Sequence, residues 1–151
     1  LNASRKAVSA GYRHHLYLVG GGELEEELRQ QVNDLQLEDT VTFLGYRQNP
    51  YGMMADCDLF VLPSLYEGFA TVISESLIAG TPVLTTDVSG AKEQITHPEY
   101  GWITENTQEG LDKGLLDALS DSARLAEMKQ QLKGYEYPND QILDEFIKVF
   151  G

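Results

Sequence analysis

The sequence has one cysteine, few basic residues and no long apolar run, and each scarcity excludes a class of protein. The single cysteine, Cys57, cannot form a disulfide within the 151-residue chain, which fits a reducing compartment such as the cytoplasm. Eleven Lys and Arg residues against 24 Asp and Glu residues give a net charge of −13. That charge argues against nucleic acid or an anionic lipid surface as a partner. No run approaches the roughly 18 apolar residues of a membrane helix, and no signal peptide is visible.

The rest of the composition, 42% hydrophobic and 23% charged residues, is that of a globular domain. Short apolar runs typical of buried strands alternate with segments of helical periodicity. We expect strands at residues 15–19, 41–44, 59–62, 83–85 and 101–104, and helices at 1–11, 23–35, 50–55, from 71 to about 79 and from 107 to 150. Strands alternating with helices predict an α/β fold with a doubly wound parallel sheet, in one domain over 1–151.

The stretch 58–90 contains the strongest functional signal of the chain. Residues 59–62 form an apolar run that fits a strand buried on both faces, and Glu67 lies in the loop that follows. Thr71 is the expected N-cap of the next helix, and Glu75 lies about one turn into it. The two carboxylates therefore bracket the point where strand becomes helix, which is where open parallel sheets bind ligands.

The run EGFATVISE (67–75) is preceded by LPS and followed by AGTPV and a TD-x-x-G loop that ends at Gly90. This order of motifs resembles the C-terminal, donor-binding half of the GT-B glycosyltransferases, in particular the family-4 group of retaining enzymes. The resemblance covers residues 16–105. It implies a Rossmann-like domain that binds a nucleotide sugar of the UDP or GDP type. It also implies that the full protein transfers a sugar to a glycan, lipid or protein acceptor.

In the resembling enzymes the glutamate that matches Glu67 hydrogen-bonds hydroxyls of the donor sugar and is the candidate catalytic residue. Gly68 lets the backbone approach the ligand, and the carboxylate matching Glu75 accepts two hydrogen bonds from the ribose hydroxyls. A helix N-terminus also favours a phosphate. By position alone, Glu67 is an ordinary loop glutamate and Glu75 an exposed helix residue. The resemblance further implies that backbone N–H groups face the sugar or the diphosphate, namely those of Phe69, Ala70 and Thr71.

Four further positions line the nucleotide-sugar pocket by resemblance. Tyr46 and Arg47 match the loop that lies against the base, although an ordinary polar loop explains them equally well. Gly22 edges the pocket, and Gly90 lets the backbone approach the sugar. Residues 20–22 are no dinucleotide fingerprint, because the third glycine of G-x-G-x-x-G would fall at Glu25. The three histidines show no ligand spacing and GT-B enzymes need no metal in the site, so we expect neither a metal nor a cofactor.

Two departures from the family pattern limit these expectations. The family's domain begins with a central strand and a Gly-rich turn whose Arg and Lys hold the diphosphate, and this chain starts after that point. The N-terminal domain that binds the acceptor is missing as well. We therefore expect a fragment that is inactive alone and whose sheet lacks its first strand. The strands at 15–19 and 59–62 would then pair directly or recruit a strand from another chain, which would allow a homo-oligomer. The alternative is an inactive GT-B-like module for binding or assembly.

Overall fold

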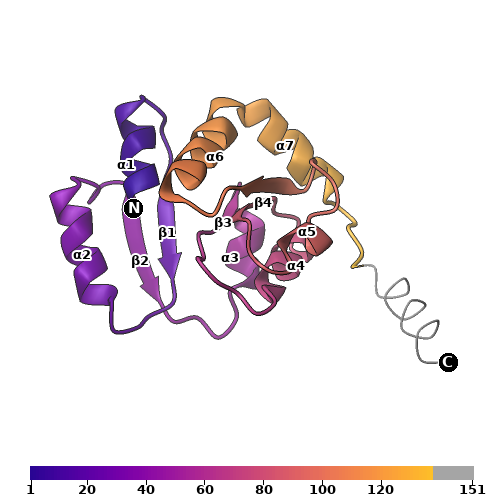
Figure 1. The fold of residues 1–151 in the computed structure, drawn as a ribbon, viewed down its shortest axis with the longest axis horizontal. Coiled ribbons are helices and arrows are strands. Elements are labelled where there is room, and N and C mark those ends of the chain that lie inside the picture. The colour runs from indigo at the N-terminus through magenta and orange to yellow at the C-terminus, as the bar shows by residue number, and fades with distance from the viewer. Residues whose placement is uncertain (138–151) are drawn as a thin grey trace.

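The computed structural model describes residues 1–137, which form seven helices and five strands (Figure 1). In chain order these are α1 (Asn2–Ser9), β1 (Leu16–Val19), α2 (Glu25–Asp34), β2 (Val41–Gly45), α3 (Tyr51–Asp56), β3 (Phe60–Leu62), α4 (Thr71–Ile78), β4 (Val83–Thr86), α5 (Ala91–Gln94), β5 (Gly101–Thr104), α6 (Gln108–Ser120) and α7 (Ser122–Gln131).

The strands form two separate parallel sheets, so the α/β class with parallel strands in open sheets is confirmed. β1 pairs with β2, placing Leu16 opposite Val41. β4 lies between β3 and β5, so that Val83 is opposite both Phe60 and Gly101. We call these parts the β1–β2 half and the β3–β5 half.

The predicted direct pairing of the strands at 15–19 and 59–62 is wrong, because β1 and β3 belong to different sheets. The two halves meet instead through their helices, chiefly by α1 packing against α6. Packed helices keep their axes about 8–10 Å apart, whereas strand pairing needs about 4.8 Å. Recruitment of a strand from another chain stays a prediction.

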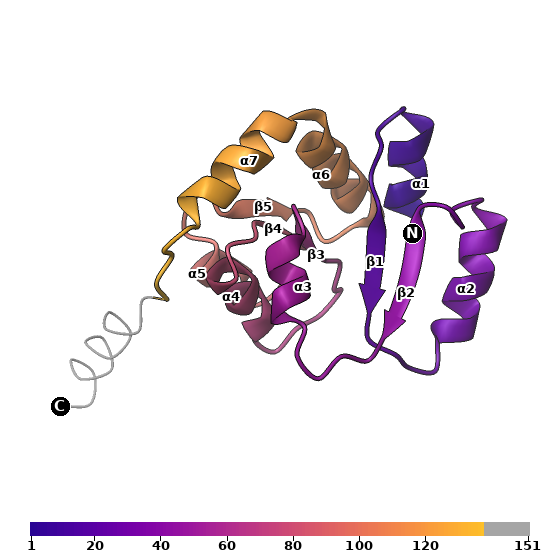
Figure 2. The same ribbon diagram turned by 180° about the vertical axis from the view of Figure 1, so that it is seen from behind.

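Helices cover both faces of the three-stranded sheet (Figures 1 and 2). α6 and α7 lie on one side, and α3, α4 and α5 lie on the other. All four residues of β4 are buried, as expected for a strand covered on both faces. On one face, a Cβ added at Gly114 of α6 would lie 2.7 Å from Cδ1 of Leu84. The opposite face packs against α4 and α5 in a core of eight buried residues: Ala70, Ile73, Leu77, Val83, Val88, Ala91, Ile95 and Leu132.

The β1–β2 half has a smaller core of three buried residues, Val32, Leu37 and Val41. In β1 the burial alternates, and Tyr17 and Val19 are 49% and 47% exposed. This half is therefore covered mainly on one face.

The predicted bounds agree with the structure to within about two residues, with three differences. Thr71 is not the N-cap of its helix: it is the first helical residue and Ala70 is the cap, which has no side-chain acceptor. α5 was not predicted as a helix. The predicted helical segment 107–150 begins with α6 and α7, and its part beyond residue 137 lies outside the described residues. None of the helices within residues 1–137 is long and apolar enough to cross a membrane.

Candidate functional site

Two loops meet at the carboxyl edge of the three-stranded sheet, because parallel strands end on the same side. The first is residues 63–70, after β3, and the second is residues 87–90, after β4. Gly90 has φ +80°, and a Cβ at this position would lie 2.7 Å from Cδ2 of Phe69. The Phe69 ring therefore rests on the Gly90 backbone and joins the two loops, which we call the glutamate loop and the glycine loop.

The carboxylate of Glu67 is half-buried and held by a neighbour in its own loop. The Ser64 hydroxyl donates to Oε1 of Glu67 at 2.6 Å. Two residues outside the loop fix its backbone: the Thr86 hydroxyl donates to the Ser64 carbonyl, and Nδ2 of Asn106 donates to the Leu65 carbonyl at 2.8 Å. The loop is thus tied to the ends of β4 and β5.

At the start of α4, not all of the three backbone N–H groups that we expected to face a ligand lack a partner within the protein. The Thr71 N–H donates to the Phe69 carbonyl at 2.9 Å, and its contact with a ligand stays a prediction. In the described part of the chain, the N–H groups of Phe69 and Ala70 have no backbone acceptor. Glu75 is half-buried in the second turn. Glu67, Gly68, Phe69, Ala70, Glu75 and Gly90 are therefore gathered around the beginning of α4.

A buried polar group lies directly behind this region. Gln94, only 4% exposed, accepts from the backbone N–H and the hydroxyl of Ser74 and donates to the Gly90 carbonyl at 3.0 Å. The sequence analysis missed Gln94, Ser64 and Thr86. The available signal for Ser64 was its place in LPS, three residues before Glu67, whereas no local signal marks Gln94.

The remaining predicted residues lie on the edge of the other sheet. The Gly20 N–H donates to the Gly45 carbonyl at 2.9 Å, which brings the loops after β1 and β2 together. Gly22 is exposed, Tyr46 is 79% exposed and Arg47 is exposed. Within residues 1–137, no hydrogen bond connects these loops with the glutamate or glycine loop. The predicted residues thus form two groups.

Asp87, the first residue of the glycine loop, has a partner in α5. Its carboxylate forms an ion pair with Nζ of Lys92 at 2.6 Å, and the N-cap of α5 is Gly90. Both side chains are largely exposed, so this pair adds little stability.

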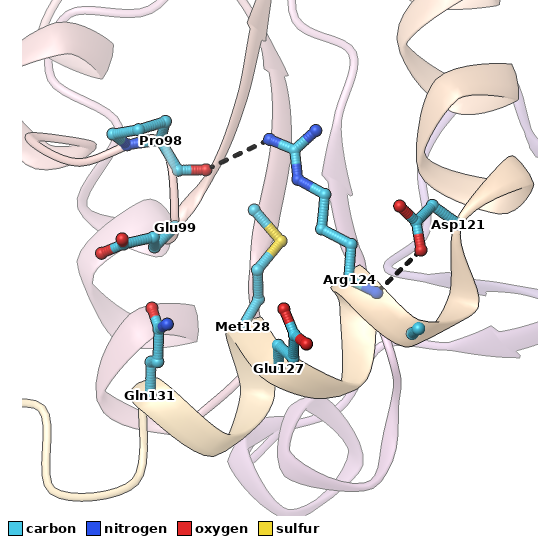
Figure 3. Close-up of a pocket in the computed structure, with 8 residues that line it drawn as sticks. Pro98, Glu99, Asp121, Arg124, Glu127, Met128 and Gln131 are labelled. Atoms are coloured by element: carbon cyan, nitrogen blue, oxygen red, sulfur yellow. Dashed lines mark hydrogen bonds between the residues drawn. The ribbon is translucent and has the colours of Figure 1, made fainter.

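A cavity of about 440 Å³ lies at the opposite, amino edge of the sheet (Figure 3). It is bounded by the segment before β5 and by α7. Arg124 donates to the Pro98 carbonyl at 3.5 Å, and its guanidinium lies 4.9 Å from the Trp102 ring centroid. The arginine is therefore engaged by the protein, and the other charged lining residues are acidic: Glu99, Asp121 and Glu127. Among residues 1–137, no three His, Cys, Asp or Glu side chains are grouped to hold a metal ion.

The sequence pattern of the family "Glycosyl transferases group 1" matches residues 3–135. One similar relative is the N-acetylgalactosamine-N,N'-diacetylbacillosaminyl-diphospho-undecaprenol 4-alpha-N-acetylgalactosaminyltransferase of Campylobacter jejuni. It is 36% identical over 120 residues, which are 78% of this chain and 33% of the relative. The lipopolysaccharide core biosynthesis glycosyltransferase LpsE of Rhizobium meliloti is 27% identical over 141 residues, 91% of this chain and 42% of the relative.

Among solved structures, Anabaena HepE in complex with UDP superposes with a TM-score of 0.73 at 28% identity. The match covers 88% of this chain and 39% of HepE. S. aureus TarM superposes with a TM-score of 0.82 at 21% identity, over 99% of this chain and 31% of TarM, which supports the fold alone. The chain thus spans about a third to two fifths of the length of these proteins.

Proposed function

The chain belongs to the glycosyl transferases group 1 family, and from this membership we propose that it is the donor-binding part of a retaining glycosyltransferase. The full protein would move a hexosyl group from a UDP- or GDP-type sugar to a glycan, lipid or protein acceptor. The observation that carries the proposal is the carboxyl edge of the β3–β5 half. There a fixed carboxylate, a glycine backbone and a helix N-terminus converge.

Glu67 is proposed to bind hydroxyls of the donor sugar. A carboxylate binds hydroxyls more tightly when its position is fixed before the ligand arrives, since an ordering cost lowers affinity. The Ser64 hydrogen bond at 2.6 Å supplies that fixing and leaves the second carboxylate oxygen free to accept from a sugar. Gly68 lies in the same loop and has no side chain, so it allows the ligand to approach the backbone.

The beginning of α4 is proposed to bind the diphosphate and ribose. The N–H groups of Phe69 and Ala70, together with the partial positive charge of the helix N-terminus, favour a phosphate. Glu75, one turn further on, would accept hydrogen bonds from the two ribose hydroxyls. As the sugar–phosphate bond breaks, these donors would stabilise the negative charge that develops on the leaving diphosphate.

In this mechanism no side chain attacks the sugar. The acceptor would approach the same face that the diphosphate leaves, and the departing phosphate oxygen would take the acceptor's proton. Glu67 and Glu75 would hold the donor without attacking it. No metal ion or cofactor takes part in the proposed transfer. Tyr46, Arg47 and Gly22 would lie along the base and ribose side of the donor. The proposed location is the cytoplasm.

The test is calorimetric titration of this chain with UDP, GDP and ADP, repeated on Glu75→Ala. The proposal predicts selective binding of one uridine or guanosine nucleotide and a loss of about tenfold or more in the variant, because a hydrogen-bonded carboxylate contributes about 1.5–3 kcal/mol. Glu127→Ala, a change at an exposed glutamate of α7 at the opposite edge of the sheet, is the matched control and should bind normally.

The second candidate is an inactive binding or assembly module, which the acidic net charge of −13 favours. Equal, weak binding of all three nucleotides, unchanged by Glu75→Ala, would support this candidate and overturn the first.

A further inference from the structure

We propose that Gln94 is a positioning residue that locks the glycine loop to α4, so that the two sides of the donor site form one rigid unit. The proposal concerns a contact within the described fold and depends on the proposed function only for the identity of the ligand. It rests on three hydrogen bonds, on the burial of the Gln94 amide and on the contact between Phe69 and Gly90.

The orientation of the Gln94 amide follows from its partners. Oε1 accepts from the backbone N–H of Ser74 at 3.1 Å and also from the Ser74 hydroxyl. Nε2 donates to the carbonyl of Gly90 at 3.0 Å. A flipped amide would place a donor against the Ser74 N–H and an acceptor against a carbonyl, so only one orientation satisfies the group.

The bond to Ser74 replaces a cap that α4 lacks. The first N–H groups of a helix have no partner within it and usually bond to the side chain of the N-cap residue. Here the N-cap is Ala70, which has no side-chain acceptor. Gln94, twenty residues further along the chain, supplies an acceptor to the N–H of Ser74 in the first turns. The start of α4 is therefore completed by a residue that follows the glycine loop.

The bond to Gly90 fixes the other side of the site. Gly90 is buried, has φ +80° and lies under the Phe69 ring, so its Cα is covered by the glutamate loop and its carbonyl by Gln94. Two contacts on opposite sides of one peptide leave the glycine loop little freedom. Because Gln94 and Ser74 are 4% and 8% exposed, water cannot easily replace these bonds.

The consequence is that the backbone of Gly90 and the first turns of α4 keep a fixed relative position in the absence of ligand. In the proposed site, Gly90 lies at the donor sugar and Glu75, next to Ser74, lies at the ribose. Gln94 touches neither, and acts only by holding the groups that do.

The primary test measures the lock without any ligand. We would compare amide hydrogen exchange in the 151-residue chain with exchange in Gln94→Leu, which keeps the side-chain volume and removes all three bonds. We expect exchange to rise about tenfold or more at both Ser74 and the glycine loop, because each loses a buried partner. Faster exchange confined to residues 91–94 would overturn the proposal.

Two further variants keep the test decisive if Gln94→Leu folds poorly. Gln94→Glu retains an oxygen for Ser74 but places a second oxygen against the Gly90 carbonyl, so only the glycine loop should loosen. Ser76→Ala is the stability control. Its hydroxyl is fully buried in the same helix but donates to the Thr81 carbonyl, at the other end of α4. Loosening of the glycine loop in Ser76→Ala equal to that in Gln94→Glu would contradict a specific role of Gln94.

A second readout separates positioning from plain stability. We would titrate UDP and UDP-glucose into each variant. Gln94→Glu should lose about tenfold more affinity for UDP-glucose than for UDP, since the loosened glycine loop contacts the sugar, whereas Ser76→Ala should change both equally. An equal loss for the two ligands in Gln94→Glu would contradict the proposal. If the unchanged protein binds neither these ligands nor their guanosine counterparts, the proposed function fails, and the exchange experiment still decides whether the lock exists.

Discussion

The two halves of this molecule have the same order of strand and helix but differ in how completely they are packed. In the β3–β5 half the middle strand is buried along its whole length and eight residues form the core. In the β1–β2 half three residues form the core, and β1 exposes Tyr17 and Val19 by almost half. The loops follow the same division. The glycine loop is held by a buried hydrogen bond and the glutamate loop by part-buried and exposed ones, whereas Tyr46 and Arg47 extend into solvent.

This difference shows which part of the proposed site is formed before a ligand binds. A loop whose carbonyls are held by residues of neighbouring strands loses little conformational entropy on binding, and an exposed aromatic side chain loses more. We therefore expect affinity for the sugar and diphosphate to come from the β3–β5 half. The loop that contains Tyr46 and Arg47 would become ordered only around a bound nucleotide.

The largest expected effects come from matched changes in the two cores. Leu77→Ala and Leu37→Ala each remove a fully buried leucine, one from each half, at a cost of about 2–5 kcal/mol. We expect Leu37→Ala to reduce amide protection mainly within residues 16–45, because the described halves share no strand pairing and meet chiefly at α1 and α6, outside this segment. Hydrogen exchange followed by residue would measure this. Equal loss of protection across both halves in both variants would mean that they unfold as one unit.

A smaller effect is expected from Thr86→Val, which keeps the shape of the side chain but removes the hydroxyl that holds the glutamate loop. The unpaired Ser64 carbonyl should cost about 1–3 kcal/mol in denaturant unfolding. In the proposed site, Glu67 would also bind UDP-glucose more weakly, and binding of UDP would change little. Thr81→Val is the matched control, because its buried hydroxyl donates to the Met54 carbonyl, outside these loops. If Thr81→Val also weakened the binding of UDP-glucose and left that of UDP unchanged, the effect of Thr86→Val would not be specific to the glutamate loop.

A pH-dependent effect should appear in the β1–β2 half, at His14. Burial lowers the pKa of His14, whose Nε2 lies 2.7 Å from the Ser4 hydroxyl of α1. A lowered pKa means that the unfolded chain binds the proton more readily, so stability falls as pH drops below the unfolded value of about 6.5. Thermal unfolding between pH 7 and pH 5 should show this decline, and His14→Phe should flatten it. An unchanged pH dependence in His14→Phe would assign the decline to other groups.

The smallest effect is expected at the surface of α2. Arg29 and Glu25 form an exposed ion pair at 2.7 Å, and such i,i+4 pairs contribute about 0.3–0.5 kcal/mol. Arg29 also lies over the Phe43 ring, 4.2 Å from its centroid. Glu25→Gln should therefore change the unfolding free energy by less than Arg29→Ala, in which the ring contact is lost as well. A larger effect for Glu25→Gln would show that the ion pair dominates.

The sequence predicted what depends on local pattern. The apolar run at residues 101–104 coincides with β5, and Thr107 caps α6 through its side chain, near the expected helix start. Glu67 and Glu75 were placed around the point where strand becomes helix, and Gly90 was assigned to the same site by resemblance. The α/β class followed from the alternation of strands and helices.

The sequence could not predict what depends on distant contacts. Thr71 is a favourable N-cap by type, yet α4 begins with Ala70 as its cap because Gln94 provides an acceptor from another element. The division into two sheets depends on which strands meet in space, and no residue of β1 or β3 specifies a partner. Asp112, buried and paired with Lys6 across the two halves, has no signature in the helix that contains it.

The central claim is that a nucleotide sugar binds at the carboxyl edge of the β3–β5 half. Its most direct test is two-dimensional NMR of the ¹⁵N-labelled chain titrated with UDP-glucose, which reports each backbone amide separately. We predict that the amides of residues 67–75 and 87–94 shift together and saturate at one ligand concentration. Shifts confined to the cavity bounded by Pro98 and Arg124, or no shifts at millimolar concentrations of either UDP-glucose or a GDP-sugar, would contradict the claim.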